Sequence, residues 1–100
     1  MGIDVLFNEY CVIKSDQRKI MDIMDRYRKL IDEGQKVTCS QFENDIVTIF
    51  GGYEVAMRHN PAIDYHFCEY VAKGFADEGR WVEVFQALYS EFPKYGGKIN

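Results

Sequence analysis

The chain of 100 residues lacks a long apolar run and lacks a basic segment near its first residues. A membrane-spanning helix needs about 18 or more mostly apolar residues in a row, and a signal peptide begins with positive charge before its apolar region. Met1 to Asp4 contain no base. We therefore expect a chain that neither crosses a membrane nor is exported, and that is cytoplasmic.

The residues that build metal sites and disulfide frameworks are also scarce. Three cysteines, Cys11, Cys39 and Cys68, are scattered along the chain, and none belongs to a C-x-x-C pair. An odd number of separated cysteines argues against both a disulfide framework and a zinc knuckle. The two histidines are separated by Asn60-Pro61, which breaks any helix that would bring them to one face. We expect reduced thiols, no metal and no cofactor.

No catalytic motif is recognisable. Gly51-Gly52 and Gly96-Gly97 lack the flanking pattern of a phosphate-binding loop. His66 and Cys68 are two residues apart and would point to different sides of a helix, which does not suit a nucleophile and its base. Adjacent acids such as Asp77-Glu78 carry no sign of the burial that tunes carboxylates for acid–base chemistry. We therefore expect a protein that is not an enzyme.

The composition is that of a folded domain. Apolar residues make up 47% of the chain and aromatic residues 15%, more than a disordered segment carries. A chain of this length is a common size for one domain. Residues 1–100 are predicted to form a single globular domain with a flexible tail from about residue 94.

One long amphipathic helix is predicted between Ser15 and Gly34. Ser15 and Asp16 open the segment, and Gly34 stands where a helix C-terminal cap is expected. The apolar residues at helical spacing are Ile20, Ile23, Met24, Tyr27, Leu30 and Ile31. The opposite face mixes acids and bases, which is typical of a solvated surface.

The segment over residues 40–60 decides the fold class. Ser40 and Glu43 have the spacing of a capping box, and an apolar stripe of helical period runs through the segment. Two features argue against a helix. Residues 46–50, Ile-Val-Thr-Ile-Phe, are rich in strand formers, and the pair Gly51-Gly52 that follows suits a hairpin turn. We expect a helix in which the glycines mark a kink or a close crossing, with a β-hairpin at residues 45–58 as the alternative.

Two further helices are predicted in the second half. The first begins at Asn60-Pro61 and ends at Gly79, and a short link leads to a helix from Trp81 that ends near Pro93. The first of them has a second, weaker apolar stripe, made of Tyr65, Cys68, Ala72 and Ala76. A helix with so little polar surface is either central in the fold or exposes a face to a partner.

The predicted fold class is all-α. We expect a small bundle of four to five helices that ends in an antiparallel helical hairpin, with an α+β fold as the alternative. The N-terminal stretch Ile3–Ile13 is short and apolar, and is compatible with a helix or an edge strand.

Charge is unevenly distributed along the chain. Between Lys14 and Lys36 there are seven basic and five acidic residues, whereas between Val37 and Pro93 there are three basic and nine acidic residues. An acidic surface repels nucleic acid and anionic membranes and attracts basic protein surfaces. Seven tyrosines and one tryptophan are potential interface anchors.

These features predict a small acidic protein-binding module that blocks a basic partner surface. Inhibitors, immunity proteins and antitoxins are of this type, as are phage-borne inhibitors of host nucleic-acid machinery. The candidate partner-binding residues are Tyr65, Glu69, Ala72, Ala76, Asp77 and Glu78.

Two alternatives stay open. The first is a structural subunit or homodimer that uses the second apolar stripe. The second is a helical nucleic-acid-binding regulator that uses the bases between Arg18 and Lys29, although acids are interleaved with them.

Overall fold

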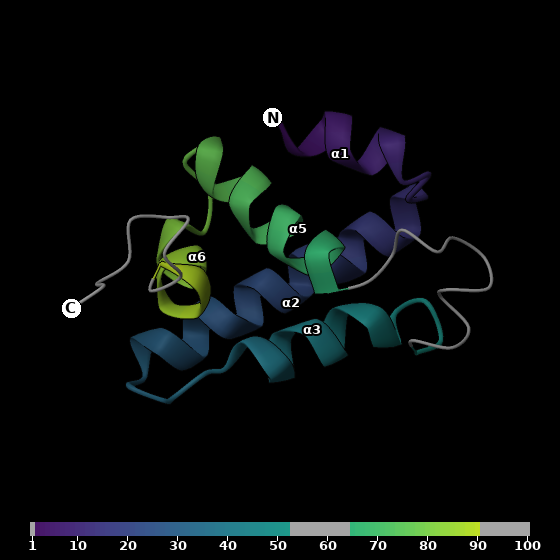
Figure 1. Cartoon of the computed structure of the whole chain (residues 1–100). Coiled ribbons are helices and arrows are strands. Elements are labelled where there is room, and N and C mark those ends of the chain that lie inside the picture. The colour runs from purple at the N-terminus through teal and green to yellow at the C-terminus, as the bar shows by residue number, and fades with distance from the viewer. Residues whose placement is uncertain (1, 53–64, 91–100) are drawn as a thin grey trace.

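The computed structural model describes residues 2–52 and 65–90, which form five helices and no strand (Figure 1). In chain order the helices are α1 (Ile3–Glu9), α2 (Lys14–Asp32), α3 (Cys39–Thr48), α5 (Tyr65–Asp77) and α6 (Val82–Tyr89). Buried apolar side chains from all five helices form one cluster. The all-α prediction is confirmed. Within its described part, the hairpin alternative is wrong, because residues 45–48 are helical and residues 49–52 form a turn.

The long helix α2 has the apolar face and the end that the sequence predicts. Its buried residues are Ile20, Ile23, Met24 and Tyr27. Gly34 follows the helix with φ at +76°. The Gly34 N–H donates to the Ile31 carbonyl at 3.0 Å, and the Gln35 N–H donates to the Leu30 carbonyl at 2.8 Å. This pair of bonds is a Schellman motif, in which glycine is favoured because it adopts positive φ without steric cost.

Helix α3 begins differently from the prediction. Its N-cap is Thr38, whose Oγ1 accepts a hydrogen bond from the Gln41 N–H at 3.2 Å. The capping box predicted for Ser40 and Glu43 is wrong, because Ser40 lies inside the helix and Glu43 bonds to another element. Thr-x-x-Gln offers the same sequence pattern as the predicted box, two residues earlier.

The glycine pair ends α3 and does not kink a longer helix. Gly51 and Gly52 have φ at +92° and +95°. Their N–H groups donate to the carbonyls of Thr48 and Val47 at 3.0 and 3.1 Å. The rest of the predicted segment and the predicted helix start at Asn60-Pro61 lie outside the described residues, as do the predicted helix end near Pro93 and the tail.

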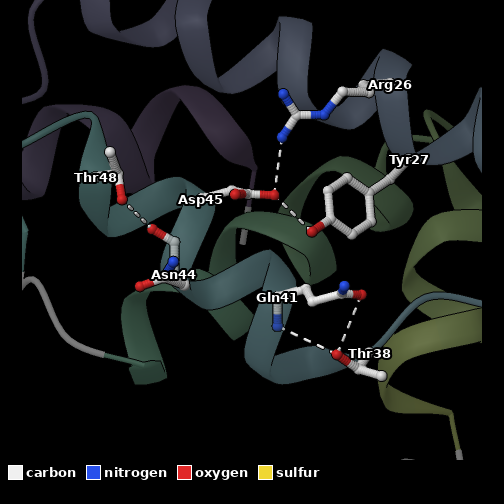
Figure 2. Close-up of polar contacts among 7 residues, drawn as sticks. All are labelled: Arg26, Tyr27, Thr38, Gln41, Asn44, Asp45 and Thr48. Carbon is white, nitrogen blue, oxygen red and sulfur yellow. Dashed lines mark hydrogen bonds and ion pairs between the residues drawn. The ribbon is translucent and has the colours of Figure 1, made fainter.

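A carboxylate joins α3 to α2. Figure 2 shows Asp45 of α3 facing Arg26 and Tyr27 of α2. Asp45 Oδ2 accepts hydrogen bonds from Arg26 Nη2 at 2.8 Å and from the Tyr27 hydroxyl at 2.7 Å. Burial, together with the hydrogen bond to Asp45, raises the pKa of Tyr27 above its ordinary value, so the hydroxyl stays protonated as a donor. The contact fixes where α3 lies along α2.

Helix α5 is central in the fold. It packs against α1, α3 and α6, and in Figure 1 it crosses the middle of the molecule above α2. Five of its apolar side chains are almost completely buried, namely Phe67, Cys68, Val71, Ala72 and Phe75. Its lack of polar surface is therefore explained by burial inside the chain.

The turn from α5 to α6 has the glycine that the sequence predicts. Gly79 has φ at +78°, and its N–H donates to the Ala76 carbonyl at 2.9 Å. Trp81 then caps α6 with φ at +50°, an uncommon conformation for a bulky side chain. Its ring lies 4.8 Å from that of Phe75, and its Nε1–H donates to Asp25 Oδ1 at 2.9 Å. Helix α6 packs directly on α5, as the predicted helical hairpin requires.

Two identical substitutions test how much the core contributes. Ile46 is completely buried, whereas Ile13 is 62% exposed. Removing one methyl group from a close-packed site costs transfer free energy and leaves a small cavity, so Ile46→Val should lower the free energy of unfolding by about 0.5–1.5 kcal/mol. Ile13→Val should change it by less than about 0.5 kcal/mol. Urea denaturation followed by circular dichroism measures both, and equal effects would contradict the core assignment.

Candidate functional site

A groove of about 340 Å³ opens on the surface between α1 and α5. Its lining is mostly apolar and comes from these two helices and from Tyr10, which directly follows α1. The residues of this α1–α5 groove are Leu6, Glu9, Tyr10, Tyr70, Lys73, Gly74 and Asp77.

The walls of the groove run antiparallel. At the start of α1, the Ile3 N–H donates to Glu78 Oε2, just beyond the end of α5, at 2.7 Å. At the other end of α1, the Tyr10 ring lies 4.8 Å from the ring of Phe67, near the start of α5. One contact at each end therefore holds α1 along α5.

Gly74 allows the two helices to come close. A Cβ atom at this position would lie 3.3 Å from Ile3 Cδ1 and 3.5 Å from Ile3 Cα. These distances are at or near the lower limit of ordinary contacts, so a larger side chain would push α1 outward.

The open side of the groove carries exposed apolar surface. Tyr70 is 43% exposed although it is a large aromatic residue, and Val5 on α1 is also exposed. Val5 lies one helical turn before Glu9, so it extends the α1 wall outward. Large apolar side chains beside a concave surface are typical of a docking place for another molecule.

The charged groups of the groove differ in their pairing. Lys73 Nζ lies 2.5 Å from Asp77 Oδ1, so these two charges largely offset each other. Among the described residues, no basic side chain forms an ion pair with Glu9. Glu9 is the last residue of α1, where the helix dipole is negative and an acid is unfavourable. The groove therefore has one acidic end that nothing within the described chain neutralises.

Two of the residues predicted to bind a partner lie inside the fold. Ala72 is completely buried and Glu69 is 4% exposed, so neither lies on the surface that the sequence analysis expected. The reason is that α1, α3 and α6 all cover α5. Ala76 is half-buried, and Tyr65 is the first residue of α5.

The two other predicted acids have partners within the chain. Asp77 is paired with Lys73 and lines the groove, whereas Glu78 accepts the Ile3 N–H. Glu9 could not be identified from the sequence, because the N-terminal stretch is compatible with a helix or a strand. Only the helical assignment places this acid at a helix end.

A second polar cluster lies between α3 and α6, away from the groove lining. The Tyr89 hydroxyl donates to Glu43 Oε2 at 3.2 Å, and the Cys39 thiol donates to the Leu88 carbonyl at 2.7 Å. Burial raises the pKa of Glu43, and the charge of Glu69 adds to the rise, whereas the Tyr89 hydrogen bond and His66 oppose it. Burial likewise raises the pKa of Tyr89 above its ordinary value.

This cluster does not have the character of a reactive centre. Burial, followed by the charge of Glu43, raises the pKa of the Cys39 thiol. A thiol with a raised pKa is a poor nucleophile at neutral pH. Within the described residues, no group of three or more histidine, cysteine or acidic side chains is placed to hold a metal ion. None of the described helices is long and apolar enough to cross a membrane.

Comparison of the chain with protein-family models, curated proteins and solved structures gave no match.

The half-buried Glu43 gives a prediction about pH. Its pKa in the folded chain is raised from 4.5, so ionisation costs stability as the pH rises through the folded-state value. Glu43→Gln keeps an acceptor for Tyr89 and removes that cost. The variant should equal the parent chain in unfolding free energy at about pH 4 and exceed it at pH 7. Urea denaturation at both pH values measures this, with Glu83→Gln, the same substitution on the exposed surface of α6, as the matched control.

The bond between Glu78 and α1 gives a second prediction. Glu78→Ala removes the acceptor of the Ile3 N–H, a loss comparable to that of a helix cap, which costs about 0.5–2 kcal/mol. Hydrogen exchange at the Leu6 and Tyr10 amides, which bond to Gly2 and Leu6 carbonyls, should become faster, while exchange in α2 changes less. Glu78→Gln keeps an acceptor oxygen and should retain part of the protection. Unchanged exchange in α1 with Glu78→Ala would show that the bond does not hold the helix.

Proposed function

We propose that the chain is a small protein-binding module that holds an apolar segment of a partner protein in the α1–α5 groove. The observation that carries this proposal is Tyr70, which is 43% exposed beside the apolar lining formed with Leu6 and Tyr10. Tyrosine is frequent among the residues that dominate binding energy at protein interfaces, because it buries a large area with few rotatable bonds.

The polar groups of the groove support binding and not catalysis. Among the described residues that line it, none is a histidine or a cysteine. Lys73 and Asp77 are bonded to each other, and Glu9 is exposed at the rim. Such groups can orient a bound segment, but they do not form a nucleophile with an adjacent base.

The acidic character of the chain favours a partner with a basic surface. The formal net charge is −4, and α1 carries Asp4 and Glu9 with no base. An inhibitor that covers a basic functional surface is one form that such a module takes. The homodimer alternative has less support, because Cys68 and Ala72 of the second stripe are buried within the chain.

The nucleic-acid alternative also has less support. Three bases of α2 have acidic partners. Lys19 lies 3.9 Å from Asp16, Arg28 lies 3.6 Å from Asp25, and Arg26 lies 2.8 Å from Asp45 of α3. Acids interleaved with bases along the exposed face would repel a phosphate backbone.

Site-specific photo-crosslinking tests the proposal. A photoreactive phenylalanine analogue replaces Tyr70 in the groove or, as a control, Asp22 on the exposed face of α2, in the full chain expressed in its source cells. A protein joined at position 70 and not at position 22 is the expected result. Tyr70→Ala should weaken binding of that purified protein by about thirtyfold, because truncating an aromatic anchor costs about 2 kcal/mol.

Three other outcomes would count against the proposal. Adducts of similar yield at both positions would indicate non-specific contact. A crosslink at position 70 between two copies of the chain would show that the groove binds a second copy and not another protein. Absence of any adduct at position 70 would remove the groove from consideration.

A further inference from the structure

We infer that the partner segment is a short amphipathic helix that lays its apolar side on Leu6, Gly74 and Tyr70 and places a basic side chain next to Glu9. This inference rests on the proposed function and names the class of partner that the same groove accepts.

The shape of the groove favours a helix. Its walls are two antiparallel helices, and no strand edge among the described residues is available to pair with an extended peptide. The α5 wall from Tyr70 to Asp77 covers about two turns, or roughly 10 Å. A third helix of two to three turns fits such a groove, as in other complexes in which an amphipathic helix lies between helices.

The mostly apolar lining of the groove favours a partner helix with apolar side chains at helical spacing. Gly74 lies between Tyr70 and Asp77 in the lining, and Ile3 occupies the space where a side chain of residue 74 would lie, so the floor of the groove is shallow there. One apolar side chain of the partner packs over this shallow floor, and another, three or four residues away, packs on the exposed ring of Tyr70.

Charge complementarity specifies the basic residue and its position. Glu9 and Asp77 mark opposite ends of the groove, because Tyr10 lies at Phe67 whereas Ile3 lies at Glu78. Asp77 already has Lys73 as its counter-ion. A partner cation therefore gains most at the Glu9 end, where the carboxylate and the negative end of the α1 dipole act together.

Two synthetic peptides test this inference. Both are 14-residue helices with leucine at positions 4, 7 and 11; one carries lysine beside this stripe and the other glutamate at the same positions. Each is titrated into the isotope-labelled full chain at low salt and followed by two-dimensional NMR. The lysine peptide should shift the amide signals of Glu9 and Tyr70 and bind about two- to fivefold more tightly than the glutamate peptide, the size expected of one exposed ion pair.

A charge reversal in the groove provides the decisive comparison. Glu9→Lys should reverse the preference, so that the glutamate peptide binds more tightly. Asp22→Lys makes the same charge change on the exposed face of α2 and should leave the preference for lysine unchanged. Equal affinities in all three proteins, or signal shifts outside the groove, would overturn the inference.

The photo-crosslinking experiment separates this inference from the proposed function. A partner joined at position 70 through a segment that is not helical, or that has no base near the joined residue, would overturn the inference and leave the binding module standing. The absence of any adduct at position 70 would overturn both.

Discussion

The close contact of Ile3 with Gly74, together with the bond from Ile3 to Glu78, controls the surface on which the proposed function depends. Helix α1 has only seven residues, too few to be stable alone in water. Its position is therefore set by what it touches on α5. Gly74 in α5, which has no side chain, and the carboxylate of Glu78 just beyond the end of α5 provide that contact. The groove is the space left beside it.

The burial of α5 explains why its exposed surface is so narrow. Three of the described helices pack on α5. Its exposed or half-buried polar residues form a stripe that includes His66, Tyr70, Lys73 and Asp77. Most of that stripe borders the groove. Most of the surface that α5 still exposes therefore lies at the groove. A molecule that binds α5 directly would contact it there.

Local sequence signals predicted the elements better than they predicted the site. The ends of α2 and α5 follow from Gly34 and Gly79, because positive φ at a helix end is a local requirement. The start of α3 was placed two residues late, since two similar capping patterns overlap there.

The site could not be predicted in the same way, because its geometry depends on contacts distant in sequence. Glu78 accepts a hydrogen bond from the Ile3 N–H, 75 positions away in the sequence. The residues next to Ile3 and Glu78 form no motif that predicts this bond. Ala72 was predicted to be exposed because the apolar pattern of one helix does not show how many other helices pack against it. The position of Glu9 in the groove depends on α1 being a helix that lies along α5.

The chain contains one tryptophan, and its position makes it a natural optical reporter. Trp81 touches Phe75 of α5 and Asp25 of α2, and the Arg80 guanidinium lies 5.0 Å from its ring. It is not part of the groove lining. Its fluorescence emission therefore reports, without an added label, whether the turn between α5 and α6 stays packed on α2. Because Trp81 does not line the groove, this signal is independent of a molecule bound there.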